Sequence, residues 1–330
     1  MIIDVSGFSF TGKGAVLDYL RGIDNIHVHE KEFEFDLIRI QDGILDLKYA
    51  LKDNWSPIRS DSAIRRFIRL TNTFARQRTS LMRPTSLFLP TGQIYEERFN
   101  KNFIRLTADY IESLIDSEIY LDWPFSNFND GPIKAFYKKI KGKLGVKTLN
   151  KYYLSFPENF ESITSVYLNS VLFSSIADDK IHVATSNAFE PFNTELSLNL
   201  FSDAKSIIVE RDPRDSFISY VNYNKIKNKD LARCCSDFII KYKILRRANQ
   251  SYVKNQNDVL NIQFEDMVNK YAETTNKIHE FLGIDKTHIN KKYIYFDPGK
   301  SKKNIHAWKK FHKEDIVERI SLELKKYCID

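Results

Sequence analysis

The sequence predicts a three-layer α/β fold, in which a central, mostly parallel sheet lies between helices and carries a helical insertion. Short apolar runs typical of buried strands recur at residues 2–5, 181–185, 206–209 and 258–264, with helical patterns between them. A mostly helical stretch, residues 55–147, interrupts this alternation. We therefore expect a single domain over residues 1–330, in which residues 55–147 form an insertion or cap that binds the acceptor.

The first fifteen residues, MIIDVSGFSFTGKGA, read as a strand, a phosphate-sized loop and the start of a helix. Glycine-rich loops at this position bind phosphate, because backbone N–H groups and the positive end of the helix converge on one anion. The spacing Gly7-x4-Gly12-Lys13 matches most of the nucleotide-binding P-loop pattern. Gly14, however, stands where that pattern has the Ser or Thr that holds Mg²⁺. We expect a P-loop-like phosphate site with no metal.

Residues 25–35, NIHVHEKEFEF, predict a second strand that runs into a loop beside the phosphate loop. A helix over residues 55–81 follows, and its polar face carries arginines that include Arg59 and Arg66. This face is either solvated or an acceptor site, since arginine forks suit carboxylate and sulfate. A helix at 103–115 leads to an aromatic loop that begins at Trp123, and the lysine-rich segment 133–147 reads as a solvated face rather than a membrane-binding one.

Further helices are predicted at residues 162–175, 215–223, 231–252, 271–282 and 315–327, and Gly283 ends the fourth of these. The strand at 206–209 runs into ERDPRDSFISY, where Asp212 suits the N-cap of the next helix. Arg211 then lies at the carboxyl edge of the sheet, where open α/β sheets bind ligands, and Ser219 lies two turns into the helix. The competing interpretation of Arg211 is an ion pair with a neighbouring carboxylate.

The composition favours a globular protein with an acidic partner. The chain has 330 residues, is 42% hydrophobic and carries a formal net charge of +7. No apolar run reaches membrane-spanning length, and the cysteines Cys234, Cys235 and Cys328 lack metal-ligand spacing. We expect a cytoplasmic protein of a reducing compartment.

Taken together, these segments resemble the sulfotransferases that use 3′-phosphoadenosine 5′-phosphosulfate (PAPS). The most specific part is the arginine followed eight positions later by serine, here Arg211 and Ser219, which in that family bind the 3′-phosphate of the cofactor. The tail GKSKKNIHAWKKF resembles the basic loop that closes over the same phosphate, with Lys300, Lys302 and Lys303 in the corresponding places. Phe264 stands where a tyrosine near the adenine is common in the family.

The resemblance also assigns the first loop to the 5′-phosphosulfate. The residues expected to bind there are Phe10, Thr11, Gly12, Lys13, Gly14 and Ala15. Phe10 takes the place where the family usually has a catalytic Lys or Arg, and Lys13 falls where it has Thr. We expect Lys13 to supply the cation that stabilises charge on the bridging oxygen as the sulfuryl group leaves.

Glu32 is the expected catalytic base, because the glycan-modifying branch of the family uses a glutamate at the end of the second strand. His29 and Glu34 are the neighbours that could replace it and would otherwise contact the acceptor. The small-molecule branch uses a histidine after the third strand, where this chain has Asn187, which cannot act as a base. This difference favours a glycan acceptor.

The resemblance thus predicts sulfuryl transfer from PAPS to a hydroxyl of an anionic or neutral glycan, with 3′-phosphoadenosine 5′-phosphate (PAP) as the product. The acceptor could be a polysaccharide, an oligosaccharide or a glycolipid. Contact with a membrane-linked acceptor is left open, and nucleic acid is not an expected partner. Two alternatives remain: a P-loop kinase or NTPase, with Asp122 as its Mg²⁺ carboxylate, and a non-catalytic nucleotide- or glycan-binding protein.

Overall fold

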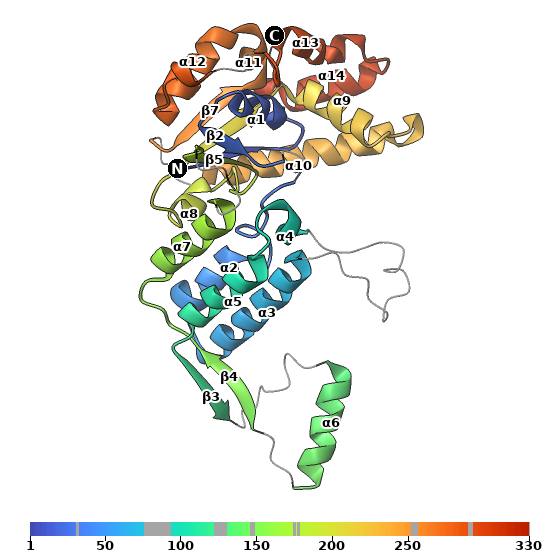
Figure 1. The fold of residues 1–330 in the computed structure, drawn as a ribbon. Coiled ribbons are helices and arrows are strands. Elements are labelled where there is room, and N and C mark those ends of the chain that lie inside the picture. Colours follow the sequence, from blue (N-terminus) through green and yellow to red (C-terminus); the bar gives the residue numbers. More distant parts are fainter. Residues whose placement is uncertain are drawn as a thin grey trace. The chain divides into compact units, whose positions relative to one another are not determined.

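The computed structural model describes residues 1–30, 33–75, 94–121, 131–145, 149–173, 176, 179–251, 257–289 and 293–329. Within it the chain forms two compact units (Figure 1). The first consists of Met1–Asp36 together with Ile176–Asp330, and the second of Leu37–Ser175. The residues predicted to form an insertion, 55–147, fall inside the second unit.

A five-stranded parallel sheet in the order β2-β5-β1-β6-β7 forms the centre of the first unit. Its strands are β1 (Ile2–Gly7), β2 (Ile26–Val28), β5 (His182–Ser186), β6 (Ala204–Glu210) and β7 (Val259–Gln263). Helices flank this sheet, so the predicted α/β class with a mostly parallel sheet is confirmed. Because β1 is central and parallel to both neighbours, the loop that follows it opens at the carboxyl edge of the sheet.

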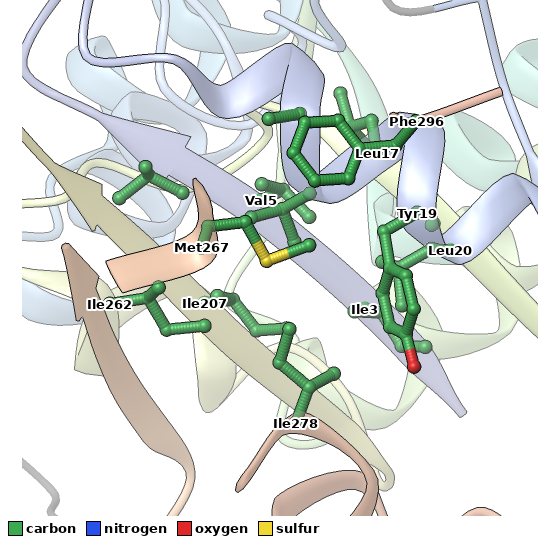
Figure 2. Close-up of a cluster of buried hydrophobic side chains, with 14 of the residues drawn as sticks. Ile3, Val5, Leu17, Tyr19, Leu20, Ile207, Ile262, Met267, Ile278 and Phe296 are labelled. Carbon is green, nitrogen blue, oxygen red and sulfur yellow. The ribbon is translucent and has the colours of Figure 1, made fainter. Parts of the chain in front are cut away.

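One hydrophobic cluster fixes the first helix, α1 (Lys13–Arg21), against the sheet. Val16, Leu17 and Leu20 of α1 are almost fully buried and belong to the same cluster as Ile3 and Val5 of β1. Figure 2 shows this cluster with Ile207, Ile262 and Met267 beside it. The cluster includes side chains of α11 (Phe264–Asn269) and α12 (Tyr271–Leu282), so the phosphate loop lies between a buried strand and a tightly packed helix.

A second cluster joins α9 (Pro213–Tyr223), α10 (Leu231–Ser251) and α14 (Glu314–Glu323). Phe217, Cys235, Tyr242 and Ile320 are all buried in it. The short helices α8 (Thr194–Leu198) and α13 (Pro298–Ser301) complete this unit, with 3₁₀ turns at Asn228–Asp230, Lys286–His288, Lys302–Asn304, Ala307–Lys310 and Lys325–Tyr327. The two ends of α9 are therefore set by a packed core, which matters because α9 carries Ser219.

The second unit is helical with a small hairpin. Its helices are α2 (Ile44–Lys48), a π-helical turn (Tyr49–Asp53), α3 (Pro57–Ala75), α4 (Tyr95–Arg98), α5 (Phe103–Leu114), α6 (Pro132–Lys143) and α7 (Phe160–Phe173). Strands β3 (Ser117–Leu121) and β4 (Asn150–Leu154) pair antiparallel. Stacked rings of Tyr110 and Tyr167, with centroids 4.3 Å apart, join α5 to α7.

The strand predicted to run into a loop within residues 25–35 is Ile26–Val28, and an isolated bridge between Glu34 and Ser186 follows it. Two other parts of the chain differ from the sequence predictions. Strands β3 and β4 were not predicted. The last helix ends at Glu323 and continues as a 3₁₀ turn, Lys325–Tyr327. No helix among the described residues is long and apolar enough to cross a membrane.

Candidate active site

The phosphate loop has a backbone that leaves no room for side chains at its glycines. Ser9, Phe10 and Gly12 all have positive φ, at 81°, 54° and 89°. A Cβ on Gly12 would lie 2.4 Å from a ring carbon of Phe264, so glycine is required for the loop to approach this ring. The amide of Ala15 donates to the carbonyl of Gly12 at 2.9 Å, and α1 begins at Lys13 with Gly14 in its first turn.

Arg211 connects this loop to α9 and to the tail. Its Nη1 donates to Ser219 Oγ at 2.8 Å and to the carbonyl of Phe10 at 3.1 Å, while Nη2 donates to the carbonyl of Asn304 at 2.6 Å. The guanidinium also lies 4.9 Å from the centre of the Phe264 ring. These contacts agree with the sequence prediction that Arg211 and Ser219 lie together at the edge of the sheet. The two residues lie next to the phosphate loop.

The neighbouring arginine, Arg214, has a structural partner instead. It forms a buried ion pair with Asp212 at 2.6 Å, and its guanidinium lies 4.0 Å from the ring centre of Trp308. Asp212 is also the N-cap of α9, as predicted, and accepts from the amide of Arg214. Asp215 accepts from the amides of His306 and Trp308 at 2.8 and 3.1 Å. These bonds hold the tail loop against α9, beside Arg211.

The electrostatics of this corner favour a bound anion. Burial lowers the pKa of Arg211, and it raises the pKa values of Asp215 and Glu265. Arginine stays protonated in proteins, so its charge remains in a poorly solvated place. Among the described residues, no hydrogen-bond partner is found for the buried atoms Thr11 Oγ1, Arg211 Nε or Trp308 Nε1. Buried polar atoms of this kind are ordinarily satisfied, and a ligand with acceptor oxygens would satisfy these donors.

Lys13 and Glu34 form the chemical centre on the other side of the loop. Lys13 Nζ donates to Glu34 Oε1 at 2.9 Å, and Asn187 Nδ2 donates to the same oxygen at 2.6 Å. Asn187 Oδ1 accepts from the amide of Gly7 at 3.3 Å. The amide side chain of Asn187 therefore bridges the end of β1 to a carboxylate that holds the loop lysine.

Asp4 holds Asn187 in place from inside the sheet. Asn187 has a positive φ of 48°, which is tolerated by asparagine more readily than by most residues. The fully buried carboxylate of Asp4 accepts from the next two amides, of Ala188 at 2.7 Å and Phe189 at 3.3 Å, and from Ser6 Oγ. Burial raises the pKa of Asp4 to about 6. The sequence analysis missed Asp4, although an acid inside an apolar strand, IIDVSG, was a visible signal, and it considered Asn187 only as a residue that cannot act as a base.

The phenyl ring of Phe10 packs on α9. Its ring centre lies 5.6 Å from that of Tyr220 and 5.5 Å from that of Tyr223. Because position 10 is a phenylalanine, Lys13 is the one cationic side chain in the loop sequence. Lys13 is the first residue of α1. Phe264, expected near the adenine, is 4% exposed and packs between Gly12 and Arg211. An adenine could contact only the edge of this ring unless the ring moves.

Other predicted site residues lie in various settings. His29 is buried, and its ring lies edge-on to His27 with centroids 4.7 Å apart. Lys302 and Lys303 are exposed on the tail, and Lys300 lies 3.9 Å from Asp297. Glu32 and Trp123 lie outside the described residues, as does Asp122 of the kinase alternative. Strand β3, which precedes Asp122, belongs to the two-stranded sheet of the second unit.

Arg59 and Arg66 lie on α3 of the second unit and have partners there. Arg66 Nε donates to Asp42 at 2.7 Å, and Arg59 Nη1 donates to Asn54 Oδ1 at 3.3 Å. Arg66 therefore has an ion-pair partner within its own unit, which neither of the two predictions for this face had included. Over the described ranges, no group of three or more His, Cys, Asp or Glu side chains is placed to hold a metal ion.

A hollow of about 610 Å³ opens between α3, α5 and the β3–β4 hairpin of the second unit. Its apolar lining residues are Ile68, Ile104, Ala108, Ile111 and Ile115. The charged residues that line it, Glu112, Asp116 and Glu118, are all acidic. Its volume falls in the range of small-molecule sites, roughly 300–1,000 Å³.

A glycine loop between a central parallel strand and a helix, next to a buried arginine, defines an α/β protein built to bind a phosphorylated ligand. Residues 140–288 match the family model described as "Sulfotransferase family". The match includes Arg211, Ser219 and Phe264, but not the phosphate loop. The matched residues make up a little under half of the chain, and over them the chain is similar to the sulfotransferase family.

Solved structures show a more distant likeness. The sulfotransferase domain of the olefin synthase from Synechococcus PCC 7002 is 11% identical with a TM-score of 0.41, over 97% of this chain and 94% of that chain. Sulfotransferase STF9 from Mycobacterium avium is 12% identical with a TM-score of 0.36, over 99% of this chain and 77% of that chain. Similarity at this level carries no argument about substrates or residues. None of the curated proteins matches the sequence.

Proposed function

We propose that this sulfotransferase takes the sulfuryl group from PAPS and transfers it to a hydroxyl of a glycan. The observation that carries the proposal is the contact between Arg211 and Ser219, 2.8 Å apart and adjacent to the phosphate loop. Such a site suits a nucleotide with two separate phosphate groups, one at the loop and one at the arginine. PAPS has this feature, and ATP, whose phosphates form a single chain, does not.

The loop and Lys13 would hold the 5′-phosphosulfate. Amides of residues 11–15 at the start of α1 can bind the phosphate that leaves as sulfur is transferred. Lys13 Nζ would stabilise the charge that builds up on the bridging oxygen. Arg211, Ser219 and the tail would fix the 3′-phosphate, which contributes mainly by orienting the donor.

Glu34 is the base that the described contacts support. The acceptor hydroxyl has to lose its proton near the sulfuryl group, and Glu34 Oε1 lies 2.9 Å from the lysine that would hold that group. The side chain of Glu34 is 36% exposed, so an acceptor can reach it. His29 is buried, and Glu32 stays a candidate on the family resemblance alone.

A glycan is the proposed acceptor. Asn187 stands where the small-molecule branch has its histidine, and here its side chain contacts Glu34 and Gly7. An amide cannot act as a base, so the structure gives no support for the histidine-dependent reaction of that branch.

Calorimetric titration with PAP and with ADP tests the donor. We expect wild-type protein to bind PAP more tightly than ADP. Arg211→Ala should weaken PAP binding by about 10- to 100-fold, since hydrogen bonds to a charged group contribute about 1.5–3 kcal/mol, and ADP binding should change little. Arg247→Ala, an exposed position on α10, is the matched control. Equal losses for PAP and ADP, or Mg²⁺-dependent ATP binding with no response to PAP, would exclude the proposed 3′-phosphate site.

A further inference from the structure

Helix α6, Pro132–Lys143, has an apolar face that is open to solvent. Its large apolar side chains, with that of Leu144 just after it, are 42–86% exposed: Ile133, Phe136, Tyr137, Ile140 and Leu144. The sequence analysis expected a solvated lysine-rich face here; Lys139 and Lys143 are indeed exposed, and the structure exposes rings and aliphatic side chains as well. Exposed apolar surface gathered on one element indicates an interaction surface.

The positions of these residues define a single stripe. At 100° per residue, spacings of three, four, seven and eleven residues place all of them within an arc of about 100°. Lysines border this stripe on both sides: Lys139 and Lys143 on one flank and Lys141 on the other, while Lys138 lies nearer the opposite face. Gly142 lies on the opposite face. The arrangement is typical of a helix that lies in the plane of a lipid interface, with lysines reaching outward to the headgroups.

The charge of this segment indicates which kind of partner the apolar stripe binds. Residues 132–147 include no Asp or Glu, so the segment carries a net positive charge. Lys139 and Lys143 are exposed and four residues apart, a spacing at which like charges destabilise a helix in water. An anionic surface would remove this repulsion and cover the apolar stripe at the same time. A dissolved polyanion would meet the lysines alone.

We propose that α6 binds the surface of an anionic lipid bilayer and so brings this enzyme to a membrane. The helix has twelve residues and is about 18 Å long, which suits reversible attachment rather than spanning. The inference does not depend on the donor or on the acceptor of the proposed reaction.

Co-sedimentation of the full chain with vesicles tests this proposal. Phosphatidylcholine vesicles are compared with vesicles that also contain phosphatidylserine. We expect binding to the anionic vesicles, weakened by salt, and little binding to phosphatidylcholine alone. The double variants Phe136→Ser/Ile140→Ser and Lys139→Glu/Lys143→Glu should each lower the affinity at least about tenfold.

Matched controls separate a local effect from a general one. Leu322→Ser changes an equally exposed apolar residue on α14. Lys227→Glu/Lys229→Glu reverses the charge of two exposed lysines of the first unit. Both variants should bind vesicles as the wild type does. PAP affinity should be unchanged in every variant, which shows that the variants fold. The proposal is wrong if the wild type ignores anionic vesicles, or if the control variants lose binding equally. A mass change in light scattering that the Phe136→Ser/Ile140→Ser variant abolishes would assign the stripe to a second copy of the chain instead.

Discussion

Arg211 and Arg214 are three residues apart, but they have different kinds of partner. These partners indicate a structural role for Arg214 and a binding role for Arg211. Arg214 has a buried carboxylate, Asp212, at 2.6 Å. Arg211 donates to a hydroxyl and to carbonyl groups, and the nearby carboxylates of Asp215 and Glu265 act on its charge from outside these hydrogen bonds. Because its hydrogen-bond partners are neutral, this position is suited to a ligand anion.

Glu34→Gln should abolish most of the turnover while PAP affinity stays near the wild-type value. The amide cannot accept a proton from the acceptor, and general bases contribute about 10²–10⁴-fold to a rate. Sulfuryl transfer from PAPS and calorimetry of PAP measure the two properties. Because the acceptor is not yet identified, a panel of glycans and glycolipids has to be screened first with the wild type.

Glu32→Gln and Glu30→Gln serve as comparisons for this residue. If Glu34 is the base, both should keep substantial activity. Near-normal turnover of Glu34→Gln with loss in Glu32→Gln would instead transfer the role to Glu32, as the family resemblance suggests.

Asp4 makes the stability of the protein depend on pH. Its pKa in the folded state is raised to about 6 from 3.8, so its contribution to the free energy of unfolding is fully present below about pH 4 and is lost as pH rises through 6. Asp4→Asn removes this titration. The free energy of unfolding of the variant, relative to wild type, should therefore rise by about 3 kcal/mol between pH 4 and pH 7.

Urea unfolding at several pH values measures this difference. Asp237→Asn, at an exposed position on α10, is the control and should follow the wild-type pH profile. Parallel profiles for Asp4→Asn and wild type would show that the Asp4 carboxyl does not titrate in this range.

At the scale of elements, α9 acts as the support of the tail loop. Asp215 accepts from the amides of His306 and Trp308, and the carbonyl of Asn304 next to them accepts from Arg211. Asp215→Ala should release residues 304–308, since buried amides that lose their acceptor cost about 1–3 kcal/mol each. We expect a red shift of tryptophan fluorescence, faster proteolysis in the tail and weaker PAP binding. Asp230→Ala is the control, and an unchanged tail in Asp215→Ala would contradict the supporting role.

Elements with strong local signals were predictable. Gly283, with a φ of 69°, ends α12 at the predicted residue, and Asp212 caps α9 as its spacing before Pro213 indicated. The hairpin β3–β4 was not predictable, because β3 is mostly exposed, β4 is only half-buried, and nearly thirty residues lie between them. When two strands are so far apart in the sequence, the residue pattern of one strand does not indicate which segment pairs with it.

For the whole molecule, the described donor contacts all lie within the first unit. The loop after β1, the start of α9 and the tail belong to Met1–Asp36 and Ile176–Asp330. PAP should therefore slow hydrogen exchange at residues 7–15, 211–219 and 304–308, and leave α3, α5 and α7 unchanged. Mass spectrometry of exchange in the intact chain measures this. Protection spread equally over both units would contradict the assignment of the donor site.

The candidate site was predictable in its residue types and less so in its partners. The spacing of Arg211 and Ser219 and the glycines of the loop were sufficient to bring them together. The contact of Lys13 with Glu34 depends on a turn at Asn187, whose position is set by Asp4 from within the sheet. These contacts join residues more than 180 positions apart. The sequence gives a signal for single residues of the series, but none for the contacts between them.

The ion pair between Lys13 and Glu34 also affects the order in which the two substrates bind. While the loop is empty, the lysine occupies the carboxylate that would take the proton of the acceptor. A phosphosulfate on the loop competes for the same ammonium group, and its arrival would remove the lysine from Glu34, which keeps its hydrogen bond from Asn187 and can then accept from a hydroxyl. The donor should thus be the leading substrate in a compulsory order, and the enzyme stays unreactive toward its acceptor until the donor is in place.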